Sequence, residues 1–325
     1  MATPPDLGSE ASPVGNRSFP SISDFVVIDR VNQCPKLASL RSINQTLSSL
    51  LNSDDSFMAQ IAEVIRLDPS LTARVLDLVN SIFFGSNESQ RVTNVEEASL
   101  FLGLSRISEL IIATPIIEEI QAFGKQSTIV DWTEFWRHSI GTAIMTRELL
   151  SAADVQWKDE GDYISGLVHN LGKIIMAVTF PEQFTELCKK TGSETNDICE
   201  QERSLLGWDH AKMGAFYLWN HHIAPEIVQA TQYHNTPQDA PDHPKLAGAV
   251  QLADHLVRSA GIHGIEKVNP PRAANWPKLE GWSILFGEED DQATDEDDDQ
   301  SIEEERMAEL QETLARVTDS LKGIV

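Results

Sequence analysis

The chain of 325 residues contains 41% apolar residues, which is enough for the core of one large globular domain or two modest ones. Its formal net charge of −25 opposes binding to phosphate backbones and anionic membranes, so neither nucleic acid nor a membrane is an expected partner. The cysteines Cys34, Cys188 and Cys199 show no CxxC spacing, which argues against a disulfide framework or a thiolate zinc site. Because the first residues, MATPPDLGSE, form no apolar leader, we expect a cytoplasmic protein.

Two segments have the composition of solvated chain. Residues 1–24 are rich in Pro, Ser and Gly, and we expect a flexible tail there. Residues 288–305 contain twelve acidic residues and no Lys or Arg. Such a run cannot bury enough apolar surface to fold, so it predicts an acidic linker.

The first part of the remaining chain has the periodicity of helices. Apolar residues recur at spacings of three and four from Met58 to Ile65, and Asp68 and Pro69 then supply an N-cap and a first helical residue. The next helix has an apolar face made of Leu71, Val75, Leu78, Val79 and Ile82.

Further helix starts and stops follow along the chain. Thr93 with Glu96 forms a capping box for a helix that ends near Gly103. A further helix runs over 106–121 with a kink at Pro115. Later helices begin after Asp131 (paired with Glu134 and reaching about Leu150), after Asp209, and at Pro225 and Pro244, with a stop at Gly261. Since no segment of any length alternates with period two, we predict an all-α fold.

Polar side chains on apolar helix faces are the candidate functional residues. His138 shares a face with Phe135, Thr142, Met145 and Leu149. Asp254 shares one with Leu246, Val250 and Val257. Buried carboxylates are rare unless they are paired or bind a metal. His169, Asn170, His210 and His234 lie between these two positions.

Two interpretations of this set stay open on the residues alone. Histidines and an aspartate spread over several helices suit Fe, Mn or Zn with water in the open positions. Alternatively, the histidines bond to Asp254, to Asn170 and to backbone carbonyls as a buried polar network. No local spacing such as HExxH decides between them.

Several segments in order resemble a known family. GLVHNLGKIIM (166–176) is similar to the segment that names the HD superfamily of metal-dependent phosphohydrolases. The segments RLDPSLTARVLDLVNSIFFG (66–85), VTNVEEASLFLGLSRISELI (92–111), FWRHSI (135–140) and LLGWDHAKMGAFYLWNHHIAPEIVQATQYHN (205–235) are similar to the HDOD domain, a bacterial signal-transduction branch. The resemblance covers about residues 32–260.

The resemblance implies how the chain is organised. An N-terminal helical bundle (25–125) would pack on an HD-like helical half (126–261). Outside the resemblance, we expect an irregular connector over 262–287 and an amphipathic helix over 306–325. The superfamily's metal ligands would fall on His138, His169, Asn170 and Asp254, with His210 and His234 as additional ligands.

The departure from the superfamily pattern is Asn170, where the pattern has Asp. An asparagine amide is neutral and is a weaker metal ligand than a carboxylate, so the pocket is expected to be degenerate. Lys173 is a candidate for contact with phosphate or, alternatively, a solvent-facing lysine at a helix end. Asn80 and Ser81 are interpreted as structural, and at most one of His221 and His222 can face the pocket.

The end of the chain carries a heptad-like apolar seam. Its members are Met307, Leu310, Leu314, Val317, Leu321 and Ile324, at spacings of three and four. An isolated helix of this length is marginal in water. The seam therefore predicts either a homodimer through 307–324 or docking on the domain's own surface.

Two functions remain. The first is a non-catalytic regulatory or scaffold HDOD module with no catalytic residues and no required cofactor, which acts through signalling protein partners. The second is a metal-dependent phosphohydrolase or phosphodiesterase acting on a nucleotide or cyclic dinucleotide. Such an enzyme needs basic groups for its substrate, and the candidates near the motifs are Lys173, Arg137 and Lys212.

Overall fold

The computed structural model describes residues 22–34, 39–53, 57–80, 91–112, 114, 131–157, 160–189, 195–265, 272–290 and 296–322. Every regular element in these ranges is a helix, which confirms the predicted all-α fold. Within the same ranges, no helix is long and apolar enough to cross a membrane. Residues 1–21 of the predicted tail (1–24), Ser81, Ile82, the kink at Pro115 and Ile324 of the predicted seam lie outside the described residues. The last residue of the predicted tail, Asp24, begins a helix instead.

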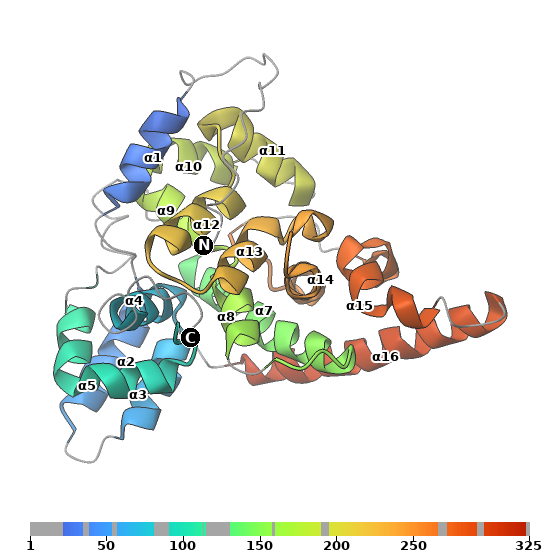
Figure 1. The fold of residues 1–325 in the computed structure, drawn as a ribbon, viewed down its shortest axis with the longest axis horizontal. Helices are drawn as coiled ribbons and strands as arrows, with labels where there is room; N and C mark the ends of the chain where they lie inside the picture. The colour runs from blue at the N-terminus through green and yellow to red at the C-terminus, as the bar shows by residue number, and fades with distance from the viewer. Residues whose placement is uncertain are drawn as a thin grey trace.

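Four short helices form the N-terminal bundle, at the lower left of Figure 1. They are α2 (Arg41–Leu51), α3 (Met58–Arg66), α4 (Pro69–Val79) and α5 (Val95–Ile112). The predicted cap of α4 is confirmed, because Asp68 Oδ1 accepts a hydrogen bond from the Leu71 amide at 2.8 Å. The apolar face of α3 is buried as its spacing predicts, through Ile61, Ala62 and Ile65.

The start of α5 differs from the prediction. Its cap is Asn94, whose Oδ1 accepts from the Glu97 amide at 2.8 Å, so the capping box expected at Thr93 is displaced by one residue. Asn is a better N-cap than Thr, and Glu97 follows Asn94 by three residues, so the local sequence also favours the cap that the structure has. The helix bends at Gly103, which has a φ of 71° inside the helical run.

The second, HD-like half is built on α7 (Trp132–Ala152), which packs between α8 and α14. The predicted caps Asp131 and Asp209 are confirmed, since they accept from the amides of Glu134 and Lys212 at 3.1 Å and 2.8 Å. The other helices are α8 (Gly161–Val168), α9 (Leu171–Thr179), α10 (Pro181–Lys189), α11 (Thr195–Leu206), α12 (His210–Asn220), α13 (Pro225–Tyr233) and α14 (Pro244–Ser259).

Helix α1 (Asp24–Asn32) lies against the HD-like half, although we expected it in the N-terminal bundle. It sits beside α9 and α12, far from α2 to α5 in Figure 1. Trp208 Nε1 donates to Asp24 Oδ1 at 3.0 Å, and Arg30 donates to the Thr179 carbonyl at 3.0 Å. These contacts join residues far apart in sequence, so no local pattern could indicate them.

The two halves are joined by buried polar contacts. Asp68, at the start of α4, accepts hydrogen bonds from Ser39 Oγ and, at 3.0 Å, from Trp136 Nε1 on α7. Glu160, before α8, pairs with Arg66 at 2.8 Å and accepts from the Val95 amide at 2.9 Å. The junction therefore holds α7 at Trp136, two residues before His138.

The expected irregular connector over 262–287 is partly helical. It contains a 3₁₀ helix (Ala273–Lys278) and the first part of α15 (Glu280–Asp290), which packs on α14. Gln251 Oε1 accepts from the Gly281 amide at 2.8 Å. A Cβ atom at Gly281 would lie 2.3 Å from the Gly248 carbonyl oxygen, so a glycine is required there. Tertiary packing outweighs the proline-rich composition that suggested a connector.

The expected acidic linker over 288–305 is also mostly helical, because α15 reaches Asp290 and α16 (Glu296–Ser320) begins within the acidic run. Acidic residues are favourable in the first turn of a helix. Of the two possibilities for the seam, the structure has it docked on α7, with Leu310, Leu314, Val317 and Leu321 buried. A Cβ atom at Gly141 would lie 3.0 Å from Leu321 Cδ1, so the glycine allows this approach. A homodimer through the seam would require α16 to leave α7.

Candidate functional site

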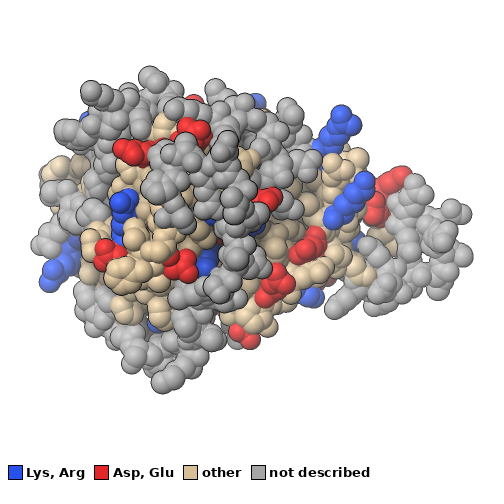
Figure 2. Space-filling view, turned by 90° about the horizontal axis from the view of Figure 1, so that it is seen from above, with Lys and Arg blue, Asp and Glu red and all other residues tan. Residues whose placement is uncertain are grey.

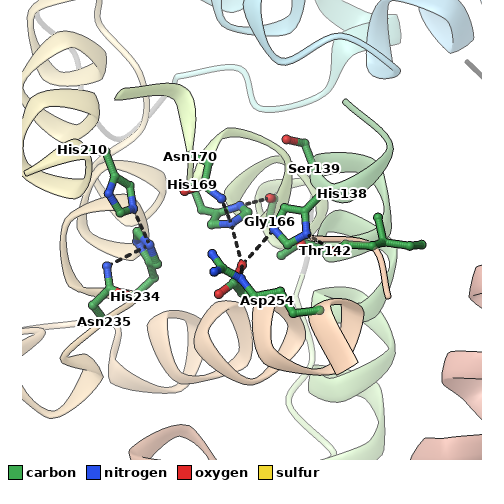
Figure 3. A network of polar contacts seen from close by, with 12 residues as sticks. His138, Ser139, Thr142, Gly166, His169, Asn170, His210, His234, Asn235 and Asp254 are labelled. Atoms are coloured by element: carbon green, nitrogen blue, oxygen red, sulfur yellow. Dashed lines mark hydrogen bonds and ion pairs between the residues drawn. The ribbon is translucent and has the colours of Figure 1, made fainter. Parts of the chain in front are cut away.

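Four histidines form a continuous row inside the HD-like half (Figure 3). Neighbouring ring centroids are 5.6 Å apart for His138 and His169, 5.2 Å for His169 and His234, and 5.4 Å for His234 and His210. All four rings are almost fully buried. Asp254 faces the two histidines at one end of the row, with Oδ1 2.8 Å from His138 Nε2 and 3.4 Å from His169 Nε2. The structure thus brings together the residues singled out from the sequence, and their role as metal ligands stays a prediction.

His169 and His234 are held by the same local arrangement. Each is the residue that ends a helix, α8 or α13, and each Nδ1 lies beside the carbonyl oxygen three residues earlier, at 2.7 Å from Gly166 and 2.8 Å from Thr231. A carbonyl oxygen only accepts, so Nδ1 carries the hydrogen in both rings. In a neutral ring, Nε2 then presents a lone pair to the interior.

An asparagine follows each of these two histidines and occupies that lone pair. The Nδ2 atom of Asn170 is 2.6 Å from His169 Nε2, and that of Asn235 is 3.0 Å from His234 Nε2. An amide nitrogen donates and cannot accept, so both Nε2 atoms accept a hydrogen bond. The hydrogen bonds of the buried polar network, the alternative to a metal site, are therefore present.

The pKa values of these two histidines agree with neutral rings. Burial lowers the pKa of His169, and the nearby carboxylate of Asp254 opposes this in part. Burial lowers the pKa of His234 well below its ordinary value, and the neighbouring His169 and His210 lower it further. Both rings are uncharged near neutral pH, as Nε2 acceptors must be.

Asp254 is charged and already has a cationic partner. Its Oδ1 lies 2.9 Å from Arg258 Nε, one helical turn further along α14, and 2.8 Å from His138 Nε2. Burial by itself raises the pKa of Asp254, but Arg258, His138 and His169 outweigh it and hold the pKa well below its ordinary value. The guanidinium therefore supplies positive charge where a metal ion would supply it. The spacing of four residues on one helix was the available sequence signal for Arg258.

His138 has an oxygen acceptor on each side of its ring. Nδ1 is 2.9 Å from the Ile262 carbonyl, and Nε2 is 2.8 Å from Asp254 Oδ1. Both contacts are hydrogen bonds only if the ring is doubly protonated, because a neutral ring has one N–H and points a lone pair at one of the two oxygens. The tautomer with hydrogen on Nδ1 would donate to Ile262 and present Nε2 as a metal ligand does.

A divalent ion is nevertheless compatible with part of this end of the row. Ligand atoms of His138, His169 and Asp254 all lie within 4.8 Å of one another. The Oδ1 atom of Asn170 is buried without a hydrogen-bond partner among the described residues, so it could serve as a weak fourth donor. To bind there, the ion would have to displace the Asn170 amide from His169 and compete with Arg258 for Asp254.

His210 is held at the other end of the row by Glu202. Glu202 Oε2 accepts from the His210 ring Nδ1 at 2.7 Å and from the His210 backbone amide at 2.8 Å. His210 Nε2 is 3.4 Å from His234 Nε2. Glu202 lies in α11 and had no sequence signal, because eight residues and a turn separate it from His210.

The three basic residues proposed to bind a substrate, Lys173, Arg137 and Lys212, have other surroundings in the structure. Lys173 is buried, with 2% of its surface exposed, so the solvent-facing alternative is wrong. Arg137 pairs with Glu134 at 2.8 Å, and Lys212 lies over the Trp208 ring. Basic and acidic side chains are interspersed on the face shown in Figure 2. Arg258, the cation that pairs with Asp254 beside the row, was not among the candidates.

The remaining polar candidates are structural. Asn80 is buried and binds the Val92 backbone twice, donating to its carbonyl at 3.1 Å and accepting from its amide at 2.8 Å. His221 and His222 both face Asp77 on α4, at 3.0 Å and 3.3 Å. Neither of these two histidines joins the row.

The described residues form helices that enclose a buried histidine row next to an aspartate. The family model of the HDOD domain matches residues 37–237, which is more than half of the chain. The chain therefore belongs to the HDOD domain family, and the resemblance drawn from the sequence is confirmed.

The chain is also similar to one further protein in sequence and to solved structures in fold. The chain is 24% identical over 234 residues to an uncharacterized protein of Treponema pallidum, and the match covers 71% of this chain and 44% of that protein. The chain therefore spans less than half of that relative's length. Its fold is similar to the MmoQ response regulator of Methylococcus capsulatus (20% identity, 69% of this chain, 86% of that one, TM-score 0.57). It is also similar to a virulence factor of Campylobacter jejuni (18% identity, 82% and 93%, TM-score 0.59).

Proposed function

We propose that this chain is a non-catalytic regulatory or scaffold module of bacterial signal transduction, working in the cytoplasm through protein partners. The observation that carries the proposal is that the histidines of the row already have hydrogen-bond partners from the protein itself. Asn170 and Asn235 bond to the two Nε2 lone pairs that a metal would need, and Arg258 neutralises Asp254.

The chemistry of Asn170 supports the same conclusion. A carboxylate at this position would add negative charge and could take a proton from a metal-bound water. The amide is neutral, and its Nδ2 donates to His169 at 2.6 Å. The pocket therefore lacks the group that would activate water at this position, while Asn170 and Arg258 stabilise the row as a polar core.

A signalling role is supported by the family and by the similar proteins. The chain belongs to the HDOD domain family, and its resemblance to that family implies a signal-transduction module. One protein of similar fold is a response regulator. The organisms that supply the similar proteins are bacteria. We infer a protein partner because the net charge of −25 opposes anionic partners.

The proposal is tested by turnover assays on the full chain loaded with Mn²⁺ or Fe²⁺. The substrates are bis(p-nitrophenyl) phosphate and a cyclic dinucleotide, and the matched control is Asp254→Asn. The proposal predicts that the wild-type protein and Asp254→Asn give the same rate as the metal ion alone. Turnover by the wild type that is lost in Asp254→Asn would refute it.

One observation favours the alternative, a metal-dependent phosphohydrolase. His138, His169 and Asp254 converge within 4.8 Å, and the buried Asn170 Oδ1 has no partner among the described residues. A bound divalent ion would polarise a phosphoryl oxygen and lower the pKa of water. The residues that would hold it are His138, His169 and Asp254. If this is the function, wild-type turnover must require His169 as well as Asp254.

A further inference from the structure

A second cluster of metal-ligating residues lies behind the His210 end of the row. Cys199 and Glu202 lie three residues apart on α11, and His210 is the first residue of α12. One ligand atom from each lies within 4.8 Å of the others. All three are buried, with at most 3% of their surface exposed. The cluster contains a thiol, a carboxylate and an imidazole.

We propose that Cys199, Glu202 and His210 form a binding site for a divalent ion of the zinc type, separate from the His138, His169 and Asp254 end of the row. Sulfur, nitrogen and oxygen ligands together suit Zn²⁺, which binds thiolate at about 2.3 Å and imidazole at about 2.0 Å. Three protein ligands leave a fourth tetrahedral position for water or another donor. The proposal is independent of whether the domain has turnover.

The proton balance of binding is simple. Burial raises the pKa of Cys199 well above its ordinary value, with Glu202 and Asp209 adding to the shift, so the thiol is protonated without an ion. When the ion binds, the sulfur–hydrogen bond breaks, a metal–sulfur bond forms, and one proton leaves to solvent. The oxidation states of sulfur and metal do not change.

Binding also changes the hydrogen on His210. Without an ion, Nδ1 donates to Glu202 at 2.7 Å, so Nε2 of a neutral ring has a lone pair that faces His234 Nε2 at 3.4 Å. If Nδ1 binds the ion, the hydrogen must be on Nε2, which then points at His234 Nε2 and competes with Asn235 for its lone pair. An ion bound at Cys199, Glu202 and His210 therefore prevents His210 Nε2 from binding a second ion in the histidine row. His210 can be a ligand in one of the two sites but not in both.

The test uses Co²⁺ as a spectroscopic substitute for Zn²⁺ on the full chain after chelator treatment. A cobalt–thiolate bond gives a charge-transfer absorption in the near ultraviolet that histidine and carboxylate ligands do not give. We expect this band to saturate at a stoichiometric amount of Co²⁺. It should disappear in Cys199→Ser and persist in Cys188→Ser, the matched control on α10. In Glu202→Gln, affinity should fall by about tenfold or more.

Two results would overturn the proposal: no charge-transfer band in the wild type, or a band that survives in Cys199→Ser. Because Cys199→Ser could lose its fold, zinc X-ray absorption on the wild type is a second measurement. A sulfur neighbour at about 2.3 Å is expected, and a shell of nitrogen and oxygen only contradicts the site. Neither measurement involves turnover, so failure here leaves the proposed scaffold function standing.

Discussion

The two ends of the histidine row differ in how a buried carboxylate is used. At the His138 end, Asp254 bonds to Arg258 from its own helix, at 2.9 Å. At the other end, Glu202 fixes the tautomer of His210 at 2.7 Å and lies in the same cluster as the Cys199 thiol. The first end already holds a fixed positive charge. The second holds a thiol whose proton an arriving cation can displace, so it is the end at which we propose that an ion binds.

The largest effect is expected from Asp254→Ala. This change leaves Arg258 and His138 buried without their shared carboxylate, which should lower the free energy of unfolding by about 3–5 kcal/mol. Urea denaturation measures it. Asp239→Ala, at an exposed position in the 3₁₀ helix Pro237–Asp239, is the control and should change stability little. Equal losses of unfolding free energy in the two variants would contradict the claim that Asp254 is part of a buried ion pair.

Arg258→Met removes the fixed positive charge beside Asp254, so that neither end of the row then has a cation paired with its carboxylate. Losing a charged hydrogen bond to Asp254 should lower the free energy of unfolding by about 2 kcal/mol. Mn²⁺ should then bind at Asp254, and a concentration a hundred times its Kd would restore about 2.7 kcal/mol. Calorimetric titration and denaturation with and without Mn²⁺ measure both parts. Arg258→Met that binds Mn²⁺ no better than wild type would show that Arg258 does not take the place of an ion.

The pH dependence of stability tests the neutral rings. The folded-state pKa of His169 and of His234 is below the ordinary value of about 6.5, so the unfolded chain binds more protons in the window below that pH. Stability must therefore rise with pH through this window, by up to about 1.4 kcal/mol per pH unit for each histidine, and be lost as pH falls. Asp254, whose folded pKa is also lowered, adds a further loss below about pH 4.

His234→Gln isolates the contribution of His234 to the change of unfolding free energy with pH. Its stability between about pH 5 and 6.5 should depend less on pH than that of the wild type, because His234 has the more strongly lowered pKa of the two. His243→Gln, a partly exposed histidine outside the row, serves as the control. A slope in His234→Gln as steep as in the wild type would argue against a neutral, buried His234.

The smallest effect is expected from Glu202→Gln. The glutamine oxygen can still accept from His210, so the loss is about 1 kcal/mol, the difference between a charged and a neutral acceptor. Thermal unfolding measures it, with Glu200→Gln on the exposed side of α11 as control. A loss as large as that in Asp254→Ala would mean that the two ends are equally important for the core.

Local features of the fold could be predicted from the sequence, and long-range ones could not. Asp68, Asp131 and Asp209 were identifiable as caps because a cap and its helix are adjacent in sequence. His138 and Asp254 were identifiable because helical spacing puts them on apolar faces. The place of α1 against α9 and α12 depends on contacts across 149 to 188 residues, which no periodicity records.

The candidate site shows the same division. The histidines of the row were predicted, and so was the chemical consequence of Asn170. What decides the state of the pocket, however, is the second partner of each group: Asn235 on His234, Arg258 on Asp254, and Glu202 on His210. Helix α15 was missed for a related reason, since it is stabilised by packing of Gly281 on Gly248 rather than by its own composition.

Whether the histidine row holds a metal ion can be measured directly by elemental analysis of the chain purified without chelator or affinity metal, in wild type, His169→Ala, Asn170→Asp and Cys199→Ser. We expect that His169→Ala leaves the metal content unchanged, that Cys199→Ser lowers it, and that Asn170→Asp raises it by placing a carboxylate beside His169. Stoichiometric Fe, Mn or Zn in the wild type that disappears in His169→Ala would refute the non-catalytic function and indicate a metal-dependent hydrolase.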